Sequence, residues 1–129
     1  YDFRRPRPIR LDDGYGRDFE GYDFNFVLNQ GWLPGRAADD LPVAARLVSP
    51  AGDLAMEIAT TEPGLQFYEG IHLAPTAEDF DGAPHRPYSG LCLEPQRFPD
   101  AINRPHFGSV VLRPGETYRQ ISRFRFRAP

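Results

Sequence analysis

The chain has 129 residues, a formal net charge of −3 and a single cysteine, Cys92. This length suits one domain with its own core, and the weak negative charge excludes the basic field with which proteins bind nucleic acid or an anionic membrane. One cysteine excludes an internal disulfide, so we expect a protein of a reducing compartment, the cytoplasm.

The first predicted elements are strands, because apolar residues recur with a period of two. Residues 22–28 alternate aromatic and apolar with polar side chains. Residues 43–48 are a short apolar run, and residues 54–59 alternate again. The turn-forming residues 49–53 lie between these two segments and predict a hairpin.

The second half of the chain continues the strand pattern. Residues 65–68 and 91–94 predict two short strands, and residues 109–112 and 117–126 flank a second hairpin turn, R-P-G-E, at 113–116. No segment keeps a helical period, and no apolar run approaches the length of a membrane span. The pattern therefore predicts an all-β fold, an antiparallel β-sandwich.

The most informative stretch is residues 90–100, which read G-L-C-L-E-P-Q-R-F-P-D. It predicts a strand that ends at Glu94, before turns at Pro95 and Pro99. A carboxylate fixed at the rim of a sheet has the placement that a general base needs, although a solvated Glu at a strand end has the same pattern. Cys92 shares the strand face of Glu94, and we expect it to be a small buried side chain.

Residues 90–100 resemble the G-x-C-L-E-x-Q-x-F-P-D motif of the aldose 1-epimerases, also called galactose mutarotases. Four further segments are similar to the family in the same order: Y-D-F-R-R-P-R-P-I at 1–9, G-Y-D-F-N-F-V-L at 21–28, T-T-E-P-G-L-Q-F-Y at 60–68 and L-R-P-G-E-T-Y at 112–118. The resemblance covers nearly the whole chain. It implies the C-terminal part of the family's large twisted supersandwich, so that residues 1–129 are one β-sandwich domain or the C-terminal portion of a larger epimerase domain.

The resemblance also implies a chemistry, the interconversion of the α and β anomers of a hexose. A base takes the proton of the C1 hydroxyl, an acid protonates the ring oxygen, and the ring recloses on its other face. No metal or redox cofactor is required. In the family the Glu of C-L-E is the base, here Glu94, and the Asp of G-Y-D binds sugar hydroxyls, here Asp23. The implied partner is a monosaccharide like glucose or galactose, whereas a surface Asp that pairs with an Arg would explain Asp23 without a ligand.

The general acid of the family is a His in the part upstream of F-D-F-R, for which this chain has no matching segment. His72, His85 and His106 do not match it, and their separations fit no metal site, so we expect surface histidines. The chain does not begin with Met. We therefore expect a missing N-terminal segment, self-association or poor solubility, because a sheet cut from a larger sandwich exposes its edges and one apolar face.

Several residues depart from the family pattern. Phe24, Pro95 and Arg97 stand where His, Thr and His are common. Arg97 would bring a cation near Glu94 and favour a carboxylate there. Trp32, in a G-W-L-P-G loop, is interpreted as a loop anchor, with stacking on a sugar ring as the alternative.

Two other interpretations remain open from the sequence. The chain could be a non-catalytic carbohydrate-binding β-sandwich related to the aldose epimerases, which keeps Asp23 and does not use an acid. It could also be a structural or regulatory domain. A sugar phosphate is disfavoured as substrate because the arginines are scattered and form no cluster.

Overall fold

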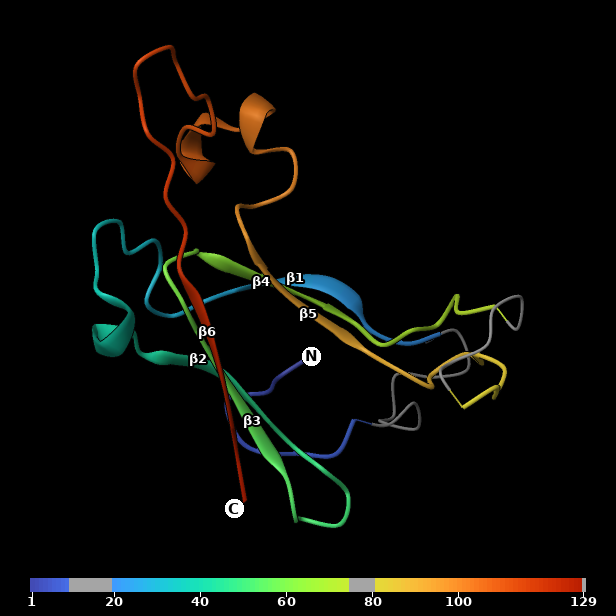
Figure 1. Cartoon of the computed structure of the whole chain (residues 1–129). Helices are drawn as coiled ribbons and strands as arrows, with labels where there is room; N and C mark the ends of the chain where they lie inside the picture. The colour runs from blue at the N-terminus through green and yellow to red at the C-terminus, as the bar shows by residue number, and fades with distance from the viewer. Residues whose placement is uncertain (10–19, 75–80, 129) are drawn as a thin grey trace. The chain divides into compact units, whose positions relative to one another are not determined.

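The computed structural model describes residues 1–9, 20–74 and 81–128. Its elements, in chain order, are β1 (Asp23–Val27), η1 (Ala38–Asp40), β2 (Val43–Val48), β3 (Ala55–Thr60), β4 (Gly64–Tyr68), β5 (Cys92–Gln96), η2 (Ala101–Asn103), η3 (Pro105–Phe107) and β6 (Ser122–Arg127), where η marks a 3-10 helix (Figure 1). None of the described residues is in an α-helix, and no helix among them is long and apolar enough to cross a membrane. The predicted all-β fold class is confirmed.

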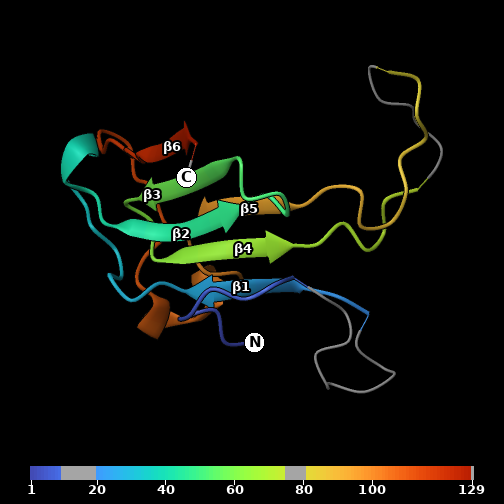
Figure 2. The same cartoon turned by 90° about the horizontal axis from the view of Figure 1, so that it is seen from below.

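The strands form two three-stranded sheets, ordered β1–β4–β5 and β2–β3–β6 (Figure 2). In the first sheet β4 is the central strand. Gly64, at the start of β4, lies against the carbonyl of Gln96 at the end of β5, and Gly70 lies against the carbonyl of Gly90 just before β5. These contacts show that β4 and β5 run antiparallel, which brings the segment after Glu94 close to the start of β4.

The predicted hairpin between residues 43 and 59 is confirmed, since β2 and β3 pair antiparallel from Val48↔Ala55 to Val43↔Ala59, with a register shift near Val43. Ser49 closes the turn. Its backbone N–H donates to the carbonyl of Leu54 at 2.8 Å, and its hydroxyl accepts the N–H of Leu54 at 3.1 Å. The hydroxyl therefore completes a turn that the backbone alone would leave with an unpaired donor.

The second predicted hairpin is wrong in part. The turn is present, with the N–H of Glu116 donating to the carbonyl of Arg113 at 3.0 Å. However, residues 109–112 and 117–121 are not strands, and only Ser122–Arg127 forms β6, which pairs antiparallel with β3. Residues 109–120 are all exposed, and none of them is paired in a sheet within the part of the chain that the structure describes.

The boundary of β5 also differs from the prediction. The strand does not end at Glu94 but continues through Pro95 to Gln96, so Glu94 is its middle residue. Proline is compatible with this position because β5 is an edge strand, where the missing N–H of Pro95 need not remove a ladder hydrogen bond.

The chain divides into two compact units, the first comprising Tyr1–Phe24 and Phe67–Cys92 and the second Asn25–Gln66 and Leu93–Pro129. The core of the first unit is aromatic. Tyr22 is fully buried and stacks on Phe67, with ring centroids 5.2 Å apart, and Phe3 packs edge-on against both rings.

The core of the second unit is built on the central strand β3. Ile58 is fully buried, and Leu41 and Leu65 are almost so. A run of three buried polar residues, 60–62, begins at the last residue of β3. Buried polar groups are stable only when they find partners, so this run marks the place where side-chain interactions organise the unit.

Candidate active site

The structure places Glu94 on the exposed side of β5. Its side chain is exposed, as is that of Cys92 on the same strand face, whereas Leu93 between them is half-buried. The prediction that Cys92 is buried is therefore wrong, because the face that it shares with Glu94 is the accessible face of the strand. A carboxylate on this face can reach a substrate from solution.

Asp23 is the first residue of β1 and is likewise exposed. Its neighbour Tyr22 is fully buried, as the period of two predicted. Phe24 is 41% exposed and packs edge-on against Tyr1, with centroids 4.8 Å apart. Asp23 belongs to the first compact unit, whereas Glu94 belongs to the second.

The three histidines do not belong to any group of potential metal ligands among the described residues. His72 and His106 are exposed and His85 is half-buried. The backbone N–H of His72 donates to the hydroxyl of Tyr68 at 2.8 Å, and the ring of His106 lies against Phe107. Within the described residues, no group of three or more His, Cys, Asp or Glu side chains could hold a metal ion.

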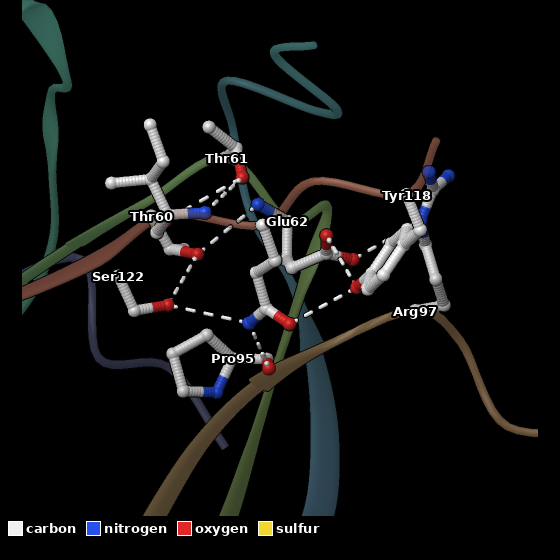
Figure 3. Close-up of polar contacts among 9 residues, drawn as sticks. Thr60, Thr61, Glu62, Pro95, Arg97, Tyr118 and Ser122 are labelled. Carbon is white, nitrogen blue, oxygen red and sulfur yellow. Dashed lines mark hydrogen bonds and ion pairs between the residues drawn. The ribbon is translucent and has the colours of Figure 1, made fainter. Parts of the chain in front are cut away.

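A buried carboxylate lies close to the segment that follows Glu94. Glu62 is fully buried between β3 and β4, and its Oε2 lies 3.1 Å from Nε of Arg97 (Figure 3). The two atoms are not aligned as a hydrogen bond, and neither Glu62 Oε2 nor Arg97 Nε has a hydrogen-bond partner within the described residues. The contact is thus an ion pair, and the Arg97 side chain itself is only 18% exposed.

Two further side chains connect Glu62 to the backbone of β5. The hydroxyl of Tyr118 lies 3.3 Å from Oε1 of Glu62 and 3.0 Å from Oε1 of Gln120, so its single hydrogen is shared between two acceptors. Nε2 of Gln120 donates to the carbonyl of Pro95 at 3.0 Å and to the hydroxyl of Ser122 at 3.3 Å. The residue directly after Glu94 therefore receives a side-chain hydrogen bond.

Hydrogen bonds of Glu62 and its two preceding residues fix the position of the Glu62 backbone. Its N–H donates to Oγ1 of Thr60 at 3.1 Å, and that hydroxyl lies 3.1 Å from the hydroxyl of Ser122 (Figure 3). Thr61 exchanges backbone and side-chain hydrogen bonds with Ile121. Glu62 is thereby held at the end of the β3–β6 ladder.

The surroundings of Tyr118 raise the pKa of its phenol above the ordinary value. Partial burial is the largest cause, followed by the negative charge of Glu62 and the hydrogen bond to that carboxylate, while the charge of Arg97 acts in the opposite direction. A phenol keeps its proton at neutral pH even at its ordinary pKa, so the Tyr118 hydroxyl acts as a hydrogen-bond donor to Glu62 and Gln120.

Arg97 has other partners than the sequence suggested. Its guanidinium carbon lies 3.8 Å from the ring centroid of Trp32, a stacked cation–π contact, in addition to the ion pair with Glu62. The cation thus compensates the buried charge of Glu62. Trp32 is 50% exposed and holds its loop against Arg97, which agrees with its interpretation as a loop anchor.

No pattern in the sequence marks Glu62, Tyr118 or Gln120 as part of the site. A Glu in a T-T-E-P-G run carries no pattern that distinguishes a buried carboxylate from a solvated one. The one available signal was Arg97, which stands where the family commonly has His. An added cation in an otherwise matching motif indicates that an anion lies nearby to compensate its charge. Which anion it meets depends on the pairing of β4 with β5, and this was not visible in the sequence.

Comparison with known proteins supplies independent information. Residues 1–125 match the family model described as aldose 1-epimerase. The chain is 37% identical over 128 residues to galactose mutarotase of Homo sapiens, 33% identical over 131 residues to aldose 1-epimerase of Haemophilus influenzae and 34% identical over 133 residues to aldose 1-epimerase of Escherichia coli. These matches cover 98–99% of the chain but only 34–36% of each relative, so the chain spans about a third of their length.

Proposed function

This chain belongs to the aldose 1-epimerase family, and we propose that it provides the general base of a mutarotase, an isomerase that interconverts the α and β anomers of a hexose. The observation that carries the proposal is the exposed carboxylate of Glu94 in the middle of β5. It belongs to the C-L-E-x-Q segment in which the family has its base, and a rigid strand with an accessible face gives a base the geometry that it needs.

In the proposed reaction, a Glu94 oxygen accepts the proton of the C1 hydroxyl while an acid donates a proton to the ring oxygen. The bond between C1 and the ring oxygen breaks, which leaves an open-chain aldehyde. After rotation about the C1–C2 bond the steps reverse on the other face of C1, and both protons return to where they came from. The reaction changes neither composition nor oxidation state.

We propose that Asp23 binds hydroxyl groups of the sugar. Its exposure on β1 supports this role, because an ionised carboxylate accepts hydrogen bonds from neighbouring hydroxyls. The proposed substrate is a glucose-like or galactose-like aldose. We place the protein in the cytoplasm, which is compatible with the free, exposed thiol of Cys92.

The test is polarimetry of α-D-galactose and α-D-glucose approaching anomeric equilibrium. The samples are this chain and a chimera in which the chain replaces the matched third of the Escherichia coli relative. We expect the chimera to accelerate equilibration and Glu94→Gln to lower its kcat by about 100-fold or more, because the amide cannot accept the proton. Asp23→Asn is expected to raise KM more than it lowers kcat.

The matched control is Glu116→Gln, which removes an exposed carboxylate from the turn at 113–116 and is expected to leave the rate unchanged. An undiminished rate in the Glu94→Gln chimera would exclude Glu94 as the base. A folded chimera without activity, together with galactose binding by the chain, would favour the second candidate, a non-catalytic carbohydrate-binding module that keeps Asp23.

A further inference from the structure

The backbone directly after Glu94 depends on side chains for its support. Pro95 has no N–H to donate, and it lies on the edge strand β5. The hydrogen bonds of the sheet therefore restrain Pro95 less than a residue that has an N–H and a neighbouring strand on both sides. Its carbonyl instead accepts a hydrogen bond from Nε2 of Gln120, which is 25 residues further along the chain. The support of the strand at this point therefore comes from outside the sheet.

Gln120 is itself held in place. Its Oε1 accepts from the hydroxyl of Tyr118, which also reaches the buried carboxylate of Glu62, and its Nε2 has a second acceptor in Ser122. Both ends of the amide are thus engaged, which fixes the side-chain rotamer and the direction of the bond to Pro95.

The same buried carboxylate holds the other end of this short segment. Arg97, two residues after Pro95, is paired with Glu62 and stacked on Trp32. The contacts close a ring that runs from Glu62 through Tyr118 and Gln120 to the carbonyl of Pro95, along the backbone to Arg97, and back to Glu62 (Figure 3). Every residue of the ring belongs to the second unit.

We infer that Tyr118 and Gln120 are positioning residues which, anchored on the buried Glu62, hold the backbone that carries Glu94. The inference deepens the proposed function and rests on the role of Glu94 given there. A base must stay within a fraction of an ångström of its working position, and a displacement of about 1 Å can lower a rate by about 100-fold. An edge strand interrupted by proline needs such a restraint more than a fully paired strand does.

The test observes Glu94 itself in the 129-residue chain. The side-chain carboxyl ¹³C resonance of Glu94 is assigned by its loss in Glu94→Gln and compared between the wild type, Tyr118→Phe and Gln120→Glu. Tyr118→Phe removes the hydroxyl that connects Glu62 to Gln120, and Gln120→Glu is isosteric but replaces the donor to Pro95 with an acceptor. We expect the resonance to shift or broaden in both variants.

Tyr88→Phe is the matched control, because it also removes a phenol hydroxyl from a partly exposed ring, one that donates to the carbonyl of Glu20 in the first unit. It is expected to leave the Glu94 resonance unchanged. Urea unfolding of all the variants is measured alongside, so that a change at Glu94 without a matching loss of stability identifies positioning. Where the chain or the chimera is active, Tyr118→Phe is expected to lower kcat by about tenfold with little effect on KM.

The two proposals fail in different ways. A Glu94 resonance that superimposes on the wild type in both Tyr118→Phe and Gln120→Glu would overturn the positioning role, whatever the activity. A resonance that responds to both variants in a protein that accelerates neither sugar's equilibration, alone or in the chimera, would support the positioning of Glu94 and refute its proposed catalytic task.

Discussion

Arg97 supplies the positive charge that compensates the buried carboxylate of Glu62. Glu62 is fully buried, and a buried charge is costly unless an opposite charge lies nearby. The guanidinium supplies this charge at 3.1 Å and covers the ring of Trp32 as well. Substitution of Arg97 would therefore leave an uncompensated carboxylate inside the second unit and also remove the cation–π contact with Trp32.

We expect Arg97→Met to lower the free energy of unfolding by about 3 kcal/mol, the usual cost of breaking a buried ion pair by removing one partner. Urea unfolding followed by tryptophan fluorescence measures the change. Arg104→Met is the control, because Arg104 forms its ion pair with Asp100 on the surface, where both side chains are largely in solvent. Equal losses of stability in the two variants would show that the burial of the Glu62–Arg97 ion pair does not increase its contribution to stability.

At the scale of elements, the first sheet depends on close approach between β4 and the segment around β5. Gly70, directly after Glu69, has φ +72°, and a Cβ atom there would collide with the backbone carbonyl of Gly90. Leu73 also lies close to this position. Glycine is thus required at residue 70 for two separate reasons, its left-handed backbone and the lack of space.

A pair of glycine variants separates these two reasons. Gly82 has a similar φ of +77°, but no atom lies within 4 Å of the place that a Cβ would occupy among the described residues. Gly82→Ala is expected to lower the free energy of unfolding by only ~1 kcal/mol, the cost of an alanine with left-handed backbone. Gly70→Ala is expected to lower it by about 2 kcal/mol more, because the backbone at Gly90 must also move. The free energies of unfolding in urea provide the comparison, and indistinguishable values would mean that Gly70 does not lie close to the carbonyl of Gly90.

At the scale of the whole molecule, one face of the β2–β3–β6 sheet exposes large apolar side chains. Phe124 and Phe126 of β6 stand across from Ile58 and Met56 of β3 and are 46% and 63% exposed. The register continues this face onto β2, where the half-buried Leu47 stands across from Met56. Contiguous apolar surface of this kind promotes association.

We therefore expect the 129-residue chain to self-associate at micromolar concentrations, as the sequence suggested. Sedimentation velocity would show a concentration-dependent rise in mass, and Phe126→Thr would reduce it, since threonine is less apolar but still favours a strand. Ile102→Thr is the control, because Ile102 is 64% exposed but lies in η2 outside the sheet. A wild-type chain that remains monomeric would contradict the expectation.

Local patterns were sufficient for the all-β class, for the hairpin between residues 43 and 59, and for the family. Alternation of side chains and turn chemistry depend on neighbours within a few residues, so they can be read along the chain. The C-L-E motif likewise marks Glu94 without any knowledge of its neighbours in space. The same information placed the end of β5 too early, because it treated Pro95 as the end of the strand.

The folded chain decided the features that depend on partners distant in sequence. Pro95 remains in β5 because that strand lies at the edge of its sheet, and Cys92 is exposed because its face of the strand is the accessible one. Glu62 is buried because it meets Arg97 of the segment after β5 and Tyr118, which is 56 positions away. Burial and charge compensation are properties of strand pairing, and strand pairing forms only when the whole unit folds.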